Sequence, residues 1–118
     1  MNNSTFSAQV REENQMIVID LKGEVNSQAE QALNQAYSEA ESKNTDTIAL
    51  NFFAVDYINS TGIALIVGLL AEARKSHKRL VVYGLSDHYV QIFQITRLSD
   101  FMDIFEDETS ALTEVFSS

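Results

Sequence analysis

Cysteine and proline are both absent from this chain of 118 residues. The absence of cysteine excludes disulfides, a catalytic thiol and any metal site built on thiolates, and it suits a reducing compartment. The absence of proline excludes turns that depend on a cis-proline bond. Only four glycines occur, which is too few for a glycine-rich loop that holds phosphates or a dinucleotide.

Basic residues are also scarce, since 8 Lys and Arg stand against 17 Asp and Glu and give a net charge of −9. So acidic a chain is repelled by phosphate, and we expect no nucleic-acid partner. The longest hydrophobic run, Ile63 to Ala71, is far shorter than the about 20 residues that cross a membrane. The first residues, Met1 to Thr5, lack the basic and hydrophobic regions of a signal peptide. We therefore expect a cytoplasmic protein without membrane insertion.

The composition that remains, 45% hydrophobic and 21% charged residues, is typical of a globular protein, and the length predicts a single domain over residues 1–118. Apolar alternation and short apolar runs predict strands over 5–11, 16–21, 47–53, 80–83 and 102–105. Helical spacing of apolar residues predicts helices over 27–42, 60–76, 86–96 and from 107 onward. The order β-β-α-β-α-β-α-β-α indicates an α/β fold with a mixed, mostly parallel sheet and an antiparallel edge strand.

Local signals predict the boundaries of these elements. Residues 13–15 form the turn between the first two strands, and Gly23 ends the second strand. Ser27 and Glu30 have the spacing of a capping box at the start of the first helix. Ser86 and Asp107 are the predicted caps of the last two helices.

The residue types that usually carry catalysis form no convincing constellation. His77 lies in a basic run and His88 in the first turn of a helix, so both are interpreted as surface residues. Four acidic residues lie close together in the sequence: Asp103, Glu106, Asp107 and Glu108. This group could suggest a cation site, but a solvated acidic turn near a helix N-terminus is the favoured interpretation. We expect no enzyme activity and no metal.

Three residues able to cap a helix, Asn59, Ser60 and Thr61, stand side by side before the most apolar segment. One such cap is enough for a helix N-terminus. Gly62 follows, and a glycine there costs helix stability but allows a close approach to the backbone. The motif therefore has two interpretations: redundant capping, or an anion-binding or phosphorylation site on the free N–H groups of the helix.

The helix that follows is apolar on all sides over Ile63 to Ala71. A helix that covers one face of a sheet needs an apolar stripe only a little over 100° wide. Either this helix is buried between the sheet and other helices, with Gly68 permitting close packing, or its first turns leave an apolar surface for a partner.

The stretch from Val55 to Leu65, with Asn59-Ser60-Thr61-Gly62 at its centre, resembles a motif of the anti-sigma-factor antagonist family, the STAS domain. That family carries Asp-Ser-Ser/Thr-Gly between a strand and an apolar helix. The segment Leu21 to Asn26 is similar to the family's glycine-acidic turn before the first helix. The strand over 48–52 and the closing segment 101–105 agree as well, so the resemblance covers nearly the whole chain. It implies a STAS-like fold.

The resemblance also implies a partner-switching regulator rather than a catalyst. The unphosphorylated protein would bind an anti-sigma factor that is a serine kinase and thereby release the sigma factor. Phosphorylation at Ser60, with Thr61 as second choice, would end that binding, and a serine phosphatase would restore it. ATP belongs to the kinase, so the chain itself needs no cofactor. The expected partner-binding residues, with Ile63 as apolar anchor, are Val25, Asn26, Asn59, Thr61, Gly62 and Ile63.

The sequence departs from the family pattern in one way, because Asn26, Asn51 and Asn59 stand where aspartate is usual. Each asparagine keeps the capping ability but removes a negative charge. An aspartate at position 59 would be a stronger hydrogen-bond acceptor for the neighbouring hydroxyl. We therefore expect slower phosphorylation than in an Asn59→Asp variant.

Two other functions stay open at this point. The chain could be a STAS module of a lipid or anion transporter that binds an ATPase subunit. It could also be a small domain that binds an anion or a nucleotide at the same helix N-terminus, although the lack of a glycine-rich loop counts against this.

Overall fold

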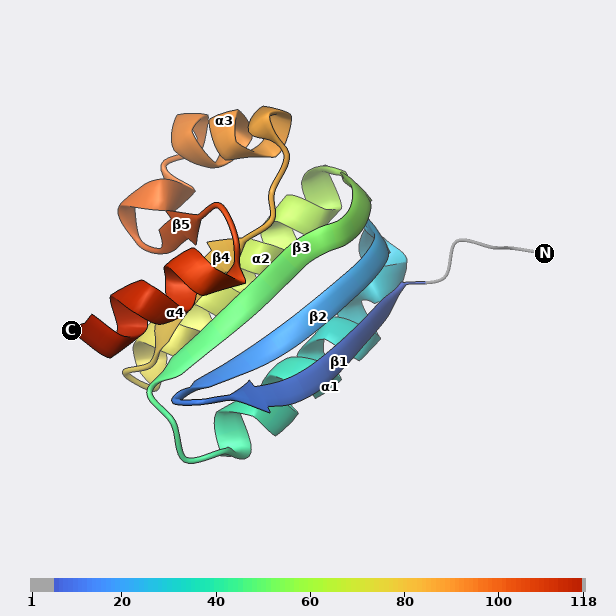
Figure 1. Ribbon diagram of the computed structural model, residues 1–118. Helices are drawn as coiled ribbons and strands as arrows, with labels where there is room; N and C mark the ends of the chain where they lie inside the picture. The colour runs from blue at the N-terminus through green and yellow to red at the C-terminus, as the bar shows by residue number, and fades with distance from the viewer. Residues whose placement is uncertain (1–5, 118) are drawn as a thin grey trace.

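A five-stranded sheet organises the computed structural model, which describes residues 6–117, and its strand order is β1-β2-β3-β4-β5 (Figure 1). The elements in chain order are β1 (Ser7–Glu13), β2 (Met16–Val25), the 3-10 turn η1 (Ser27–Ala29), α1 (Glu30–Ser42), β3 (Thr47–Ile58), α2 (Ser60–Lys75), β4 (Arg79–Tyr83), α3 (Asp87–Ile95), the 3-10 turn η2 (Leu98–Asp100), β5 (Asp103–Phe105) and α4 (Glu108–Ser117). Strand β1 is antiparallel to β2, and the other neighbouring pairs are parallel. This confirms the predicted mixed sheet with an antiparallel edge strand.

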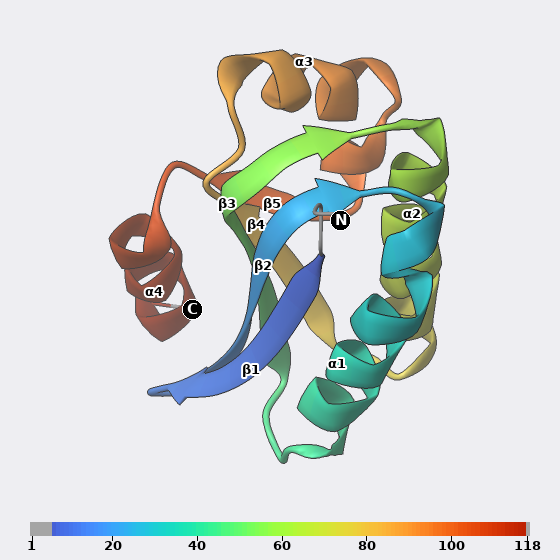
Figure 2. The same ribbon diagram turned by 90° about the vertical axis from the view of Figure 1, so that its right-hand side faces the viewer.

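The helices lie in separate layers, which Figure 2 shows from the side. Helices α1 and α2 cover one face of the sheet, α4 covers part of the other, and α3 lies near the carboxyl end of β3. Successive side chains of β2 point to opposite faces of the sheet: Ile17 and Ile19 pack toward α1 and α2, whereas Met16 and Val18 pack toward α4. Because both faces are covered along its first half, β2 reads as a nearly continuous apolar run.

Strands β2 and β3 are both longer than predicted. Gly23 has a positive φ of 98° but does not end β2, which continues to Val25. The pairing with β3 shifts register between Asp20 and Lys22 and again between Gly23 and Glu24. Such irregularities bend a strand without breaking it. The extended β2 then gives β3 a partner as far as Ile58.

The start of the first helix also differs from the prediction. The predicted cap Ser27 opens the 3-10 turn η1, and α1 begins only at Glu30, without a side-chain cap. The cap of η1 is Asn26, because it has an extended backbone and its Oδ1 accepts a hydrogen bond from Gln28 N at 2.9 Å. The predicted caps of the last two helices are confirmed. Ser86 Oγ accepts from Tyr89 N at 3.4 Å, and Asp107 Oδ1 accepts from Ser110 N at 2.8 Å.

The apolar helix α2 is not buried on all sides. Ile66, Leu69 and Ala73 lie in the core, whereas Val67 is 44% exposed. A β-carbon at Gly68 would meet nothing within 4 Å, so the expected close packing at this glycine is wrong. Helix α2 therefore leaves apolar surface in solvent. Over the described part of the chain, every helix is too short or too polar to cross a membrane.

Candidate functional site

Two connections lie against each other at the carboxyl edge of the parallel strands. One follows the end of β2 at Val25, and the other joins the end of β3 to the start of α2. Val25 pairs with Ile58 in the sheet, and Asn59 N donates a hydrogen bond to Val25 O at 3.2 Å. This contact brings Asn26 and Asn59 to neighbouring positions. In sheets of this kind the carboxyl ends of the strands are the usual place for a binding site.

Asn59 is the residue that caps α2. Its backbone is extended, and its Oδ1 accepts from Gly62 N at 2.8 Å while its carbonyl accepts from Ile63 N at 2.9 Å. Ser60 and Thr61 already belong to the helix, and both side chains are exposed. Among the three polar residues, Asn59 is thus the one that caps the helix, and the hydroxyls of Ser60 and Thr61 do not act as its cap.

The Ser60 hydroxyl makes no hydrogen bond to any other residue of the segment 6–117. It lies in the first turn of α2, where backbone N–H groups lack partners within the helix and the positive end of the helix dipole is located. The bond from Asn59 to this hydroxyl, on which the expected difference in phosphorylation rate depends, is not formed, because Asn59 Oδ1 is bonded to Gly62 N.

Gly62 is needed for a close approach, but the approaching group is the protein's own strand. A β-carbon at position 62 would lie 2.8 Å from the carbonyl carbon of Val25 and closer still to its oxygen. Val25 is 0% exposed and Gly62 is buried. The expectation that both contact a partner through their own surface is wrong for these two residues. They determine how closely α2 packs against the end of β2.

The surface around Ser60 is built from other side chains. Thr61 and Ala64 are exposed, while Asn26 and Ile63 are half-buried, and Ile63 packs against the core. Tyr57, three residues before Ser60 along the chain, is 51% exposed. Tyr57 was not among the predicted site residues, although an aromatic residue in the stretch before the motif was a usable signal.

A second residue missed from the sequence is Tyr89 of α3. Its hydroxyl accepts from Ile58 N at 2.9 Å and donates to Ile58 O at 3.3 Å, in a buried position. Both backbone groups of the last residue of β3 are thus held by one side chain immediately before the cap Asn59. No local pattern in the sequence indicates this contact, because 31 residues separate the partners.

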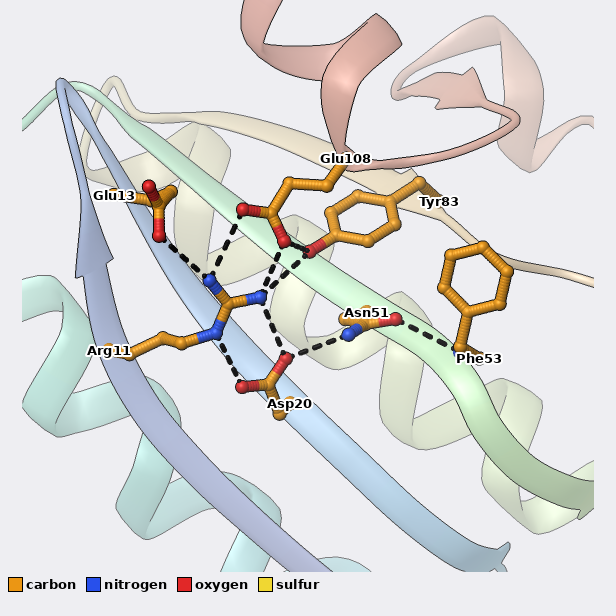
Figure 3. A network of polar contacts seen from close by, with 7 residues as sticks. All are labelled: Arg11, Glu13, Asp20, Asn51, Phe53, Tyr83 and Glu108. Carbon is orange, nitrogen blue, oxygen red and sulfur yellow. Dashed lines mark hydrogen bonds and ion pairs between the residues drawn. The ribbon is translucent and has the colours of Figure 1, made fainter.

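Asn51 is the third of the asparagines named in the sequence, and it lies away from the start of α2. It belongs to a polar network on the face of the sheet where α4 packs (Figure 3). Asn51 Nδ2 donates to Asp20 Oδ1 at 2.7 Å, and Asn51 Oδ1 accepts from Phe53 N at 3.0 Å. Arg11 joins the same carboxylate to α4, with bonds of 2.6 Å to Asp20 Oδ2 and 2.6 Å to Glu108 Oε1. Asn51 therefore has a role in packing rather than at the start of α2.

Charge pairing in this network moves two carboxyl pKa values. The hydrogen bond from Arg11 lowers the pKa of Glu108, with a smaller contribution from the Tyr83 hydroxyl, and these outweigh partial burial. Burial alone would raise the pKa of Asp20, but hydrogen bonds from Arg11 and Asn51 bring it below its usual value. Both groups are charged at neutral pH.

The acidic turn near the last helix is therefore only partly a solvated one. Glu108 belongs to the network, Asp103 pairs with Arg79 at 2.6 Å, and Asp107 caps α4. The N–H of Ser110 lowers the pKa of Asp107. His77 and His88 are exposed, as predicted. Among the described residues, no group of three or more His, Asp or Glu is arranged to hold a metal ion.

Comparison with known proteins identifies the family. Residues 8–106 match the family model described as "Mlab, STAS domain". The chain is 31% identical over 88 residues to the anti-sigma-B factor antagonist of Listeria monocytogenes, which covers 75% of this chain and 77% of that protein.

Solved structures show the same fold. An anti-sigma factor antagonist from Mycobacterium paratuberculosis superposes with a TM-score of 0.82 at 18% identity, covering 97% of each chain. The Bacillus cell fate determinant SpoIIAA in its phosphorylated form gives a TM-score of 0.70 at 24% identity, covering 92% of this chain and 99% of that one. Together with the family model and the curated relative, these similarities show that the chain belongs to the anti-sigma-factor antagonist family, the STAS domain.

Proposed function

We propose that this chain is an anti-sigma-factor antagonist that switches partners through phosphorylation of Ser60. The unphosphorylated form binds an anti-sigma factor with serine kinase activity, and the phosphorylated form does not. A serine phosphatase returns the chain to the binding form. The observation that carries the proposal is the state of Ser60: an exposed hydroxyl in the first turn of α2, released from capping because Asn59 takes that role.

The position suits a switch that acts on binding and leaves the fold intact. A phosphoserine adds about −1.5 to −2 charges at pH 7. At a helix N-terminus such a charge is favourable by about 0.3–2 kcal/mol, since it meets free N–H groups and the positive end of the dipole. The free energy of unfolding should therefore not fall when Ser60 is modified.

A bound partner would experience the same charge very differently. The surface beside Ser60 includes the half-buried Ile63 and the exposed Ala64, which lie three and four residues further along α2. A partner that packs apolar side chains there would have to desolvate the phosphate, and burial of an unpaired charge is strongly unfavourable. Phosphorylation thus removes the partner through the cost of desolvation at the centre of the contact.

The test compares Ser60→Ala and Ser60→Glu with wild type in binding to the candidate anti-sigma factor kinase, by isothermal titration calorimetry. Ser60→Ala should bind as wild type does and incorporate no phosphate at this helix when incubated with kinase and ATP. Ser60→Glu should bind at least about tenfold more weakly, which corresponds to 1.4 kcal/mol. Intact-mass analysis with residue mapping assigns the phosphate to Ser60 or to Thr61.

The matched control is Ser38→Glu, which adds the same charge at an exposed position of α1. It should bind like wild type. If Ser60→Glu also binds like wild type, Ser60 is not the switch. If a transporter ATPase subunit binds the chain, and binds both Ser60 variants as tightly as wild type, the transporter-module function would be favoured instead.

A further inference from the structure

A groove of about 710 Å³ lies away from the start of α2, between the second half of α2 and the segment from the end of α3 through η2. Its floor is apolar, formed by Leu70 and Leu98, which are 6% and 5% exposed. Its walls include Val67, 44% exposed, and Phe101, 53% exposed. Large hydrophobic side chains that stay this open around a hollow mark a surface able to take up an apolar group.

The rim of the groove is basic in a chain that is otherwise strongly acidic. Arg74, Lys75 and Arg97 line it, which is three of only 8 Lys and Arg in the whole sequence. Within residues 6–117 the lining contains no Asp or Glu. The side chains that line this groove thus carry positive charge, whereas the chain as a whole has a net charge of −9.

Two of these cations have no carboxylate partner. Arg74 lies over the ring of Phe101, 5.2 Å from its centroid, and forms no ion pair with another described residue. Lys75 likewise forms no ion pair within residues 6–117. Only Arg97 is paired, with Asp100 at 2.6 Å. An incoming carboxylate would thus meet two cations that it need not compete for.

The groove and Ser60 lie on one side of α2. Residues three or four apart share a helix face, and the series Ser60, Ala64, Val67, Ala71 and Lys75 follows this spacing with every member exposed. A protein that contacts Ser60 can therefore continue along α2 for the length of the helix and reach the groove.

We propose that the groove receives an acidic segment of the same partner that binds at Ser60, with an apolar side chain between Val67 and Phe101 and carboxylates on Arg74 and Lys75. This inference rests on the proposed function for the identity of the partner. Charge complementarity selects the occupant, because a basic segment would be repelled by the rim and an uncharged one would gain nothing from it.

The experiment measures binding of the anti-sigma factor kinase to Lys75→Glu and, as matched control, to Lys43→Glu. Both substitutions reverse one charge at an exposed or half-exposed lysine near the end of a helix, but Lys43 lies at the end of α1, outside the groove lining. Lys75→Glu should bind about five- to tenfold more weakly than Lys43→Glu in low salt, and the difference should shrink as ionic strength rises. Phe101→Ala should weaken binding with little dependence on salt.

The outcomes separate the groove from the switch. If Lys75→Glu and Lys43→Glu bind the kinase with equal affinity while Ser60→Glu binds more weakly, the proposed role of the groove would be refuted. The proposed function would be unaffected. If Ser60→Glu binds the kinase as tightly as wild type while Lys75→Glu binds more weakly, the proposed switch at Ser60 would be refuted and the proposed role of the groove would be supported. Self-association of the wild-type chain in sedimentation, abolished by Lys75→Glu while kinase binding is unchanged, would make a second copy the occupant and refute the proposal.

Discussion

At the scale of single residues, the contacts of Asn51 show why an asparagine suits this position better than an aspartate. Its amide nitrogen donates to Asp20, and its amide oxygen accepts from Phe53 N. A carboxylate has no donor, so it could make only the second of these bonds. The side chain is half-buried, which limits the help that water can give. Asn51 is thus required by its neighbour Asp20.

We predict that Asn51→Asp destabilises the fold by about 1–3 kcal/mol at pH 7, because one hydrogen bond is lost and two carboxylates face each other. Urea unfolding followed by circular dichroism measures the change. The double variant Asp20→Asn with Asn51→Asp restores one donor to the pair and should recover part of the loss. Stability equal to wild type in the single variant would show that Asp20 and Asn51 are not coupled.

At the scale of elements, the contact between the end of β2 and the first turn of α2 determines where Ser60 lies. Three features form it: the hydrogen bond from Asn59 N to Val25 O, the capping bond from Gly62 N to the side chain of Asn59, and the absence of a side chain at Gly62. Tyr89 holds the last residue of β3 from the side of α3. Secondary-structure elements therefore hold the site from both sides.

We predict that Gly62→Ala destabilises the fold by about 1–3 kcal/mol, the usual cost of overpacking, since the new methyl group would collide with the Val25 carbonyl. This is opposite in sign to the intrinsic preference, because alanine favours a helix over glycine by about 1 kcal/mol.

Gly68→Ala on the same helix is the matched control. A β-carbon there meets nothing within 4 Å, so this variant should be stabilised by up to about 1 kcal/mol. Thermal unfolding of both variants provides the comparison. A Gly62→Ala protein as stable as Gly68→Ala would mean that α2 does not pack as described.

At the scale of the whole molecule, Arg11 ties together elements from both ends of the chain (Figure 3). It lies on β1 and bonds to Asp20 on β2, to Glu108 at the start of α4 and to the Tyr83 hydroxyl of β4. Lowered carboxyl pKa values stabilise the fold above the pKa of the unfolded chain, and this contribution is lost as pH falls through the folded pKa.

We predict that acid removes the contribution of this network. The ordinary pKa values are 3.8 for Asp20 and 4.5 for Glu108, and both are lowered on folding, so the stabilisation is complete at neutral pH and begins to disappear below about pH 5. Arg11→Gln should cost about 1–2 kcal/mol at pH 7, between the values for exposed and buried ion pairs.

The difference between Arg11→Gln and wild type should shrink as pH falls below the ordinary pKa values of the two carboxyl groups, and it should vanish once both are protonated in the folded chain. Urea unfolding at a series of pH values measures it. A difference that stays constant from pH 7 to pH 3 would show that Arg11 stabilises the fold by packing and not through its carboxylate partners.

Much of this molecule follows from local sequence. The order of strands and helices, the antiparallel hairpin and the caps Ser86 and Asp107 depend on side-chain periodicity and on bonds across three residues, which a sequence displays directly. The motif from Asn59 to Gly62 indicated the start of α2 and the candidate Ser60 for the same reason.

Other features were decided only by the tertiary structure. The lengths of β2 and β3 depend on each other, because a strand continues only while a neighbour offers hydrogen bonds. Val25 and Gly62 are buried since they face each other across two segments distant in sequence, and Asn51 is bonded to Asp20 on another strand. Tyr89 and the basic groove follow from where α3 packs. Each rests on contacts between residues far apart along the chain, which periodicity and local capping do not encode.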